Sequence, residues 1–291
     1  MQWNDIAAPI STHISQVTGQ SFQVDHQRSV GGGSVNQAYA FTGENCSYFV
    51  KLNQAGRLAM FEAEALGLRE ISKTGAIRVP EPICWGVSGN SAYLVLEWLE
   101  LGYGEPQSWE TMGYNLAAMH RVTSSQGFGW HQNNTIGFIP QINSWTQSWT
   151  EFWTEHRLGY QLQLARRKGG RFPQADRLLA AIPEILAGYN PQPSLVHGDL
   201  WTGNAAVTLA GEPVILDPAT YYGDREVDLA MSQLFGSFPA RFYSAYQEAY
   251  PLDSGYKTRK ILYNLYHIIN HFNQFGGSYE SQANQMIADL L

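Results

Sequence analysis

The stretch from Leu195 to Asp217, LVHGDLWTGNAAVTLAGEPVILD, constrains the fold of this chain most strongly. Asp199 opens a short polar loop, Asn204 follows five positions later, and Asp217 comes thirteen positions after Asn204. Two short apolar segments flank residues 210–213, so they predict a β-hairpin with a four-residue turn. Such a hairpin returns Asp217 to the side of Asn204. The sequence therefore predicts that one carboxylate and two further oxygen groups lie together.

The residue types at these positions fit phosphoryl transfer. Asp199 offers an acceptor for the proton of a substrate hydroxyl, and Asn204 and Asp217 supply hard oxygen atoms of the kind that Mg²⁺ takes from proteins. Each residue taken singly is more typical of turn chemistry. Together, at this spacing, they are typical of the catalytic loop and the metal-binding loop of protein-kinase-like enzymes.

The composition limits what else the chain can be. Its 291 residues suffice for two lobes with a substantial core, and 44% apolar with 15% charged residues is typical of a globular protein. The net charge of −7 argues against a nucleic-acid partner. We find no signal-like segment and no run of 18 apolar residues, so we expect no membrane association and a cytoplasmic location. Cys46 and Cys84 form no CxxC pair, which predicts neither a zinc site nor a disulfide framework.

The N-terminal part has the pattern of a nucleotide-binding sheet. An amphipathic helix with Ile6, Ile10, Ile14 and Val17 on one stripe comes first. The segment VGGGSVN then interrupts an extended region before the strand-like residues 37–41. Consecutive glycines let the backbone approach phosphate oxygens, although a glycine run alone is as often a flexible turn. The residues expected at the phosphates are Gly31, Gly32, Gly33 and Ser34.

Lys51 lies near the end of the strand-like segment Ser47–Leu52 and resembles the strand lysine of kinases, which pairs with phosphates and a helix glutamate. We predict a helix over Leu58–Ser72, on which Glu64 lies about 60° from the centre of the apolar face and Glu62 about 100° away. A carboxylate beside a buried face needs a partner, so we expect Glu64 to pair with Lys51, with Glu62 as second choice. The alternative is an edge-strand lysine and two solvated glutamates.

The predicted boundary between two lobes follows the buried strand AYLVL at residues 92–96. We expect an N-terminal lobe over residues 1–96 with the ATP-binding sheet and helix, a hinge over 97–102, and a helical C-terminal lobe over 103–291 with the catalytic and metal loops. In a two-lobed kinase the hinge backbone supplies the hydrogen bonds to adenine, which places Glu97 and Leu99 at the nucleotide.

Three residues of the C-terminal part allow more than one interpretation. Asp228 either caps the helix that it begins or braces the catalytic loop by accepting backbone N–H groups. His267 and His271 are four apart and share a helix face, as two metal ligands would. No HExxH motif accompanies them, so the sequence favours ordinary packing.

The chain resembles the fructosamine kinase family, or ketosamine-3-kinases, a branch of the kinase-like superfamily that includes aminoglycoside phosphotransferases and choline kinases. The resemblance covers nearly the whole chain and rests on VGGGSVN, YFVKLN, FEAEALGL, LVLEWLELG, HGDLWTGNAA, VILDPATYYGDREVDLAM, FYSAYQEAYPL and LYHIINHFNQFG. It implies an α+β, bilobal protein-kinase-like fold with a small β-rich N-lobe and a larger, mainly helical C-lobe.

The resemblance also implies an activity, namely ATP-dependent phosphorylation of the 3-hydroxyl of a sugar ketoamine, which destabilises the adduct and frees the amine. The cofactors would be ATP and Mg²⁺, and the partner a small or protein-bound ketosamine. The implied roles are those of a base for Asp199, metal ligands for Asn204 and Asp217, phosphate binding for Lys51 with Glu64, and substrate contact for Trp201 and His197. Ser34 stands where some relatives have a cysteine linked to redox-controlled dimerisation, so that regulation is not predicted.

Other functions remain as alternatives. A kinase for an amino alcohol, an aminoglycoside or a thiosugar would keep the same catalytic residues and differ only in its pocket. A protein kinase is disfavoured because HGD replaces HRD, DPA replaces DFG, and no APE follows. A pseudokinase is disfavoured because Lys51, Asp199, Asn204 and Asp217 are all present. The sequence leaves open the sugar length, the amine and the oligomeric state.

Overall fold

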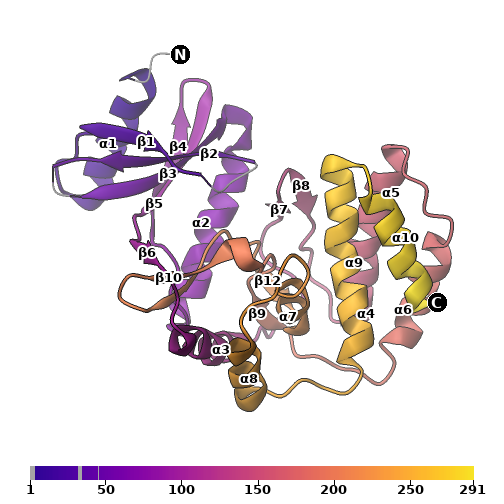
Figure 1. Cartoon of the computed structure of the whole chain (residues 1–291). Helices are drawn as coiled ribbons and strands as arrows, with labels where there is room; N and C mark the ends of the chain where they lie inside the picture. Colours follow the sequence, from indigo (N-terminus) through magenta and orange to yellow (C-terminus); the bar gives the residue numbers. More distant parts are fainter. Residues whose placement is uncertain (1–3, 32–34, 45) are drawn as a thin grey trace.

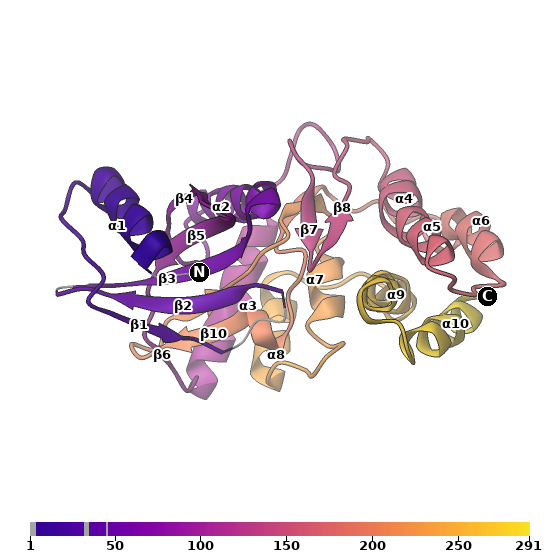
Figure 2. The same ribbon diagram turned by 90° about the horizontal axis from the view of Figure 1, so that it is seen from above.

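The computed structural model of the chain describes residues 4–31, 35–44 and 46–291. A β-sheet region built from the first third of the chain lies at one end of the molecule (Figure 1). Helices from the last two thirds form the other end, with α5, α6 and α10 farthest from the sheet in both views (Figure 2). This is the two-part, α+β arrangement that the resemblance implied.

The N-terminal sheet has five antiparallel strands in the order β1-β2-β3-β5-β4. They are β1 (His26–Ser29), β2 (Gln37–Thr42), β3 (Ser47–Gln54), β4 (Pro82–Ser88) and β5 (Ser91–Glu97). Helix α1 (Asn4–Thr18) packs on β4 through Ile6, Ile10 and Ile14, all of which are buried. The expectation that Val17 shares this buried stripe is wrong. Its side chain is 53% exposed, because the apolar cluster under α1 ends at Ile14.

Helix α2 (Leu58–Lys73) follows a single 3₁₀ turn and joins the two parts of the molecule. It packs on β4 and β5 through Phe61, Ala65, Leu68 and Ile71, which recur at helical spacing and are all buried. Its other contacts reach β7 in the C-terminal part. A side chain on α2 is therefore well placed to face the space between the two parts.

The C-terminal part combines short strands with helices. Its strands are β6 (Leu101–Gly102), β7 (Asn134–Ile136), β8 (Ile139–Gln141), β9 (Ser194–Val196), β10 (Ala205–Thr208), β11 (Pro213–Ile215) and β12 (Tyr221–Gly223). Its helices are α3 (Pro106–His120), α4 (Trp149–Phe152), a π-helical stretch (Trp153–Gly159), α5 (Tyr160–Arg167), α6 (Ala175–Ile185), α7 (Glu226–Met231), α8 (Ala240–Ala249), α9 (Tyr256–Phe275) and α10 (Tyr279–Leu290). Helix α9 packs on α5, α7 and α10 and forms the centre of this part.

The predicted hairpin exists, but its turn lies one residue earlier than expected. Strands β10 and β11 are antiparallel with Val207 opposite Pro213, and Leu209–Glu212 forms the turn. Proline is tolerated as the first residue of a strand, so Pro213 joins the ladder. Leu209 leaves the strand and is 72% exposed. On its other edge β10 pairs with β6, so the predicted hinge segment is hydrogen-bonded to this hairpin.

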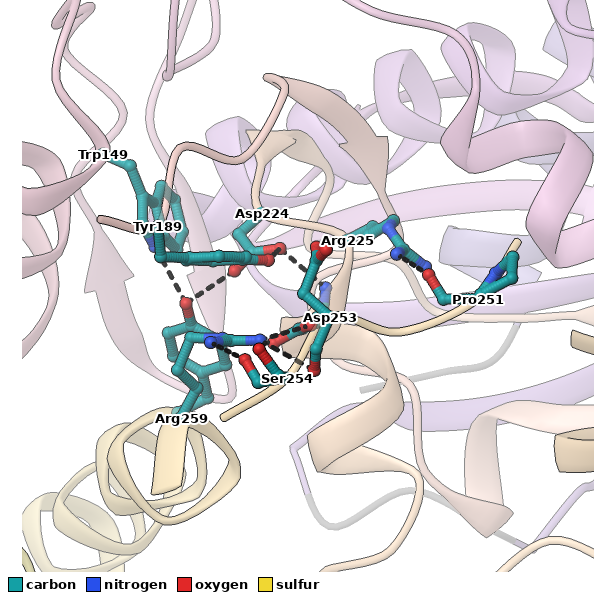
Figure 3. A network of polar contacts seen from close by, with 10 residues as sticks. Trp149, Tyr189, Asp224, Arg225, Pro251, Asp253, Ser254 and Arg259 are labelled. Carbon is teal, nitrogen blue, oxygen red and sulfur yellow. Dashed lines mark hydrogen bonds and ion pairs between the residues drawn. The ribbon is translucent and has the colours of Figure 1, made fainter. Parts of the chain in front are cut away.

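A buried polar network, here called the closed network, ties α9 to the segment after β12. It comprises Tyr189, Asp224, Glu226, Arg259 and Tyr263. Figure 3 labels Tyr189, Asp224 and Arg259 of this set. Asp224 accepts hydrogen bonds from the hydroxyls of Tyr263 at 2.5 Å and Tyr189 at 3.0 Å. The guanidinium of Arg259 donates to both carboxylate oxygens of Glu226, at 2.7 and 2.9 Å. Arg259 also lies over the ring of Tyr189, 3.6 Å from its centre. The network fixes α9 relative to α7.

Within the described ranges, no helix is both long enough and apolar enough to cross a membrane.

Candidate active site

A cleft of about 640 Å³ lies between the N-terminal sheet and the C-terminal part. The side of the cleft formed by the sheet is apolar and is lined by Val30, Val35, Ala38, Phe49 and Leu96. Leu216 faces them from the C-terminal part. A flat apolar slot of this kind suits a purine ring, because pockets for cofactors are mainly apolar with a few polar groups that fix orientation. Gly31, Glu97 and Leu99 also line the cleft, whereas Gly32, Gly33 and Ser34 lie outside the described residues.

The side chain of Glu97 is turned away from a role as a ligand. It pairs with Arg78, and its Oε2 accepts the backbone N–H of Glu81 at 3.1 Å. The backbone N–H of Glu97 donates to the carbonyl of Glu81 at 2.8 Å, so its backbone carbonyl is the group that a nucleotide could meet. The adenine contacts of Glu97 and Leu99 stay predictions.

Lys51 is buried in the centre of the sheet and holds two carboxylates. Its Nζ lies 2.7 Å from Glu64 Oε1 and also contacts Asp217. Its side chain and that of Glu64 are only 7% and 11% exposed, whereas that of Asp217 is 48% exposed. The predicted ion pair with Glu64 is confirmed. The second choice, Glu62, lies on the exposed face of α2.

The loop before Asp199 is held by Asp228. Its two carboxylate oxygens accept the backbone N–H groups of His197 at 2.7 Å and Gly198 at 2.8 Å. Burial alone would raise the pKa of Asp228, but the hydrogen bonds that it accepts from His120 and from the backbone N–H of Gly198 hold that pKa below its usual value. Gly198 has φ of +84°, and a Cβ there would collide with the carbonyl of Ala219. Of the two roles predicted for Asp228, bracing the catalytic loop is the one observed.

His197 does not face the cleft, which corrects the predicted substrate contact. Its side chain is fully buried. Its Nε2 donates to the carbonyl of Leu216 at 2.7 Å, and its Nδ1 accepts the backbone N–H of Asp199 at 3.2 Å. Burial lowers the pKa of His197, so the imidazole is neutral. The ring therefore links the catalytic loop to the strand that leads to Asp217.

Asp199 lies at the floor of the cleft with its side chain 20% exposed. Burial, together with the negative charge of Asp228, raises the pKa of Asp199 to about 7, against a lowering by the hydrogen bond from Asn204. Asn204 Nδ2 donates to the backbone carbonyl of Asp199 at 2.9 Å and lies 3.4 Å from its Oδ2. A carboxylate that is held and half desolvated in this way can accept a proton from a bound hydroxyl.

Asn204 and Asp217 can together hold a hard divalent cation. The backbone N–H of Leu216 donates to the carbonyl of Asn204 at 2.9 Å, so the hairpin brings Asp217 back beside Asn204. Asn204 uses its amide nitrogen on Asp199, which leaves its amide oxygen as a ligand. In the described part of the chain no group of three or more His, Cys, Asp or Glu side chains could hold a metal. Two oxygen groups fit Mg²⁺, which keeps phosphate and water as its other ligands.

The opposite end of the cleft is aromatic and was mostly missed by the sequence analysis. It is lined by Trp201, Met231, Phe235, His271, Gln274 and Tyr279. His271 lies against the rings of Phe235 and Tyr279, with centroids 4.6 and 5.2 Å away, and its Nδ1 donates to the carbonyl of His267. The shared helix face of His267 and His271 was visible in the sequence. That this face meets the cleft depends on the tertiary packing of α9, which no local pattern gives.

The comparisons with known proteins agree with this geometry. The family model described as fructosamine kinase matches residues 6–291. The chain belongs to the fructosamine kinase family. Fructosamine kinases are phosphotransferases, so the protein is an enzyme of that class.

Two relatives and one solved structure place the chain within this family. "Probable ketoamine kinase" of Synechocystis sp. is 57% identical over 282 residues, covering 97% of this chain and 96% of that protein. "Protein-ribulosamine 3-kinase, chloroplastic" of Arabidopsis thaliana is 42% identical over 278 residues, or 94% of this chain and 85% of that protein. The crystal structure of a protein assigned as fructosamine-3-kinase from Haemophilus somnus 129PT has a TM-score of 0.92 at 33% identity, covering 97% and 96% of the two chains.

The wider fold is that of kinase-like phosphotransferases. The aminoglycoside phosphotransferase APH(4)-Ia has a TM-score of 0.64 at 14% identity, with 99% of this chain and 98% of that chain covered. At this identity the similarity concerns the fold alone. It confirms the predicted protein-kinase-like architecture of this chain.

Proposed function

We propose that the protein is an ATP-dependent kinase that phosphorylates the 3-hydroxyl of ketosamines. The observation that carries the proposal is the position of Asp199 in the cleft. It lies between the apolar side, which we assign to the nucleotide, and the aromatic end with Trp201, Phe235 and Tyr279, here called the acceptor wall. Phosphoryl transfer needs the acceptor hydroxyl in line with the γ-phosphate and near a carboxylate, and this junction offers both. The names of the relatives, which include ketoamine and ribulosamine kinases, support the choice of acceptor.

The residues divide the work as follows. Lys51, held by Glu64, binds the phosphates together with the glycine segment that begins at Gly31, and the backbone of Glu97 and Leu99 binds adenine. Asn204 and Asp217 hold Mg²⁺, which when bound neutralises charge on the phosphates. Asp199 orients the acceptor hydroxyl and takes its proton. Contact between Lys51 and Asp217 brings the phosphate-binding and metal-binding groups to the same point.

The acceptor wall favours a sugar over a polycation. Among the residues that line this end of the cleft, the described part shows aromatic and neutral polar side chains and no carboxylate apart from Asp199 and Asp217. An aminoglycoside brings several ammonium groups, which such a wall would leave unpaired and partly desolvated. A ring such as Trp201 packs well against a sugar face. Phosphate at carbon 3 is a good leaving group, so the product then releases the amine and the adduct is removed.

The test is ADP release from Mg-ATP with a panel of acceptors. The panel contains the ribulose, fructose and erythrulose adducts of lysine, together with choline, an aminoglycoside and a thiosugar. We expect turnover with the ketoamines alone, and their ranking gives the preferred sugar length. Turnover with only one of the other compounds would keep the catalytic residues but reject the ketosamine assignment. No turnover with any compound, in spite of Mg-ATP binding, would reject the proposal as a whole.

A further inference from the structure

Three buried histidines surround the catalytic loop, and they differ in how their ring nitrogens are used. His120 has both nitrogens occupied, by the Tyr246 hydroxyl at 2.8 Å and by Asp228 at 3.1 Å. His197 is occupied at both nitrogens as well, as described above. All four ring nitrogens of these two histidines are hydrogen-bonded within the protein, as is usual for buried polar atoms.

His267 is the exception. It lies in the middle of α9 with 4% of its surface exposed, and its Nδ1 is buried without a hydrogen-bond partner among the described residues. Oδ1 of Asp199 lies 3.9 Å from this nitrogen. That distance is too long for a hydrogen bond. A movement of about 1 Å would bring the two atoms into hydrogen-bond range.

Asp199 has a carboxylate oxygen that accepts no hydrogen bond from the described residues. Its backbone carbonyl and its Oδ2 face Asn204, whereas Oδ1 has no hydrogen-bond donor among the described residues. A catalytic carboxylate needs one oxygen directed at the acceptor hydroxyl, and it keeps that direction only if its other contacts fix its rotation. Nδ1 of His267 on α9, which has no hydrogen-bond partner, therefore faces Oδ1 of Asp199 on the catalytic loop, which accepts no hydrogen bond within the described ranges.

We propose that His267 is a positioning residue that donates its Nδ1–H to Oδ1 of Asp199 in the Mg-ATP-bound enzyme, which turns Oδ2 toward the place that the acceptor hydroxyl takes. The inference rests on the proposed function for the identity of the acceptor. During transfer the hydroxyl proton moves to Asp199, and the His267 proton stays on its nitrogen. His267 acts through Asp199 and touches neither phosphate nor sugar.

The surroundings of His267 favour the neutral ring that this role needs. Burial, and next to it the nearby His271, lower the pKa of His267 to about 3. A neutral imidazole has one N–H, and the carboxylate opposite Nδ1 favours the tautomer that carries it there. Helix α9 is held relative to α7 by the closed network at its N-terminal end.

The test compares two substitutions of matched size. His267→Leu removes the donor, while His267→Asn keeps an N–H donor near the position of Nδ1. For His267→Leu we expect kcat to fall about 10- to 100-fold, as for the loss of a hydrogen bond to a charged group. The KM values for ATP and for the ketoamine should stay within about threefold. His267→Asn should recover most of the lost kcat.

Several outcomes would overturn the proposal. They are a His267→Leu enzyme that keeps its kcat, a loss that appears only in KM, and equal losses in both variants with no rescue by Asn. Thermal unfolding and Mg-ATP binding show whether each variant is folded. If His267→Leu does not fold, His267→Asn still decides, because a donor role predicts near-normal kcat for it and a strict packing role does not.

A second measurement needs no acceptor and separates this inference from the proposed function. Side-chain ¹⁵N NMR of the Mg-ATP-bound enzyme should show a proton on Nδ1 of His267 and a shift of that signal in Asp199→Asn. An Nδ1 without a proton, or a signal that ignores Asp199→Asn, would overturn the positioning role. If the wild-type enzyme turns over no ketoamine while this signal behaves as expected, the proposed function fails and the His267 assignment stands.

Discussion

Two acid-rich regions of the C-terminal part lie close together in the sequence and behave in opposite ways. The first, here called the open cluster, contains Asp199, Asn204 and Asp217 and faces the cleft. The second is the closed network around Asp224, Glu226 and Arg259 (Figure 3). In the open cluster the side chains of Asp199 and Asp217 are 20% and 48% exposed. In the closed network Asp224 and Glu226 are fully buried.

The difference lies in how the polar atoms are used. Asp224 accepts hydrogen bonds from two tyrosines and a backbone N–H, and the two carboxylate oxygens of Glu226 accept from Nε and Nη2 of Arg259. The open cluster leaves Oδ1 of Asp199 unfilled and exposes half of Asp217. Folding has thus satisfied one region internally and left the other to be completed by ligands. Buried polar groups normally find partners within the protein, so an incomplete set at a cleft points to function.

The largest effect on stability is expected in the closed network. Arg259→Leu leaves Glu226 buried without its cation, which should lower the free energy of unfolding by about 3–5 kcal/mol. The exposed Lys257 on the same helix is the matched control, and Lys257→Leu should change it by no more than about 0.5 kcal/mol. Urea unfolding followed by circular dichroism gives both values. The kcat of folded Arg259→Leu enzyme should match that of the wild type.

The contrast between the two regions would break if Arg259→Leu were as stable as the wild type and yet inactive. Arg259 and Glu226 would then take part in catalysis. Complete hydrogen bonding of a buried carboxylate could then not be used to tell a structural residue from a catalytic one.

A second substitution tests the ion pair between Glu64 and Lys51, which adjoins the open cluster through the contact of Lys51 with Asp217. Its expected effect is on catalysis and is smaller. Glu64→Ala should lower kcat/KM for ATP about 10- to 100-fold, because it removes a charge-assisted hydrogen bond from a buried lysine. Glu62→Ala, on the exposed face of the same helix, should change it less than about twofold. Steady-state kinetics with ATP as the varied substrate measures both. The reverse order would mean that the observed ion pair has no part in phosphate binding.

Much of the open cluster was predictable because short-range geometry determines it. The spacing of Asp199, Asn204 and Asp217 predicted a loop and a hairpin, and a helical rotation of 100° per residue separated Glu64 from Glu62. The hairpin turn was misplaced by one residue because the apolar run suggested that Leu209 continues the strand, whereas Pro213 joins the ladder instead. These inferences needed only residues near each other in the chain.

The remaining features depend on contacts between distant segments. The acceptor wall needs α9 and α10 beside the catalytic loop, and the closed network joins Tyr189, Asp224 and Arg259 from three separate segments. The family resemblance implied a substrate contact for His197, but the fold buries its ring against Leu216. No periodicity in the sequence shows whether the ring of His197 faces the cleft or an internal partner. The predicted roles of the site residues in binding and catalysis stay predictions until they are measured.

The most direct test of the account is the turnover of Asp199→Ala, measured together with its affinity for Mg-ATP. The account predicts that kcat with the best ketoamine falls about 10²- to 10⁴-fold, as for the loss of a general base. It also predicts that Mg-ATP still binds, because Lys51, Asn204 and Asp217 remain in place. Unchanged turnover in a folded Asp199→Ala enzyme would contradict the central assignment.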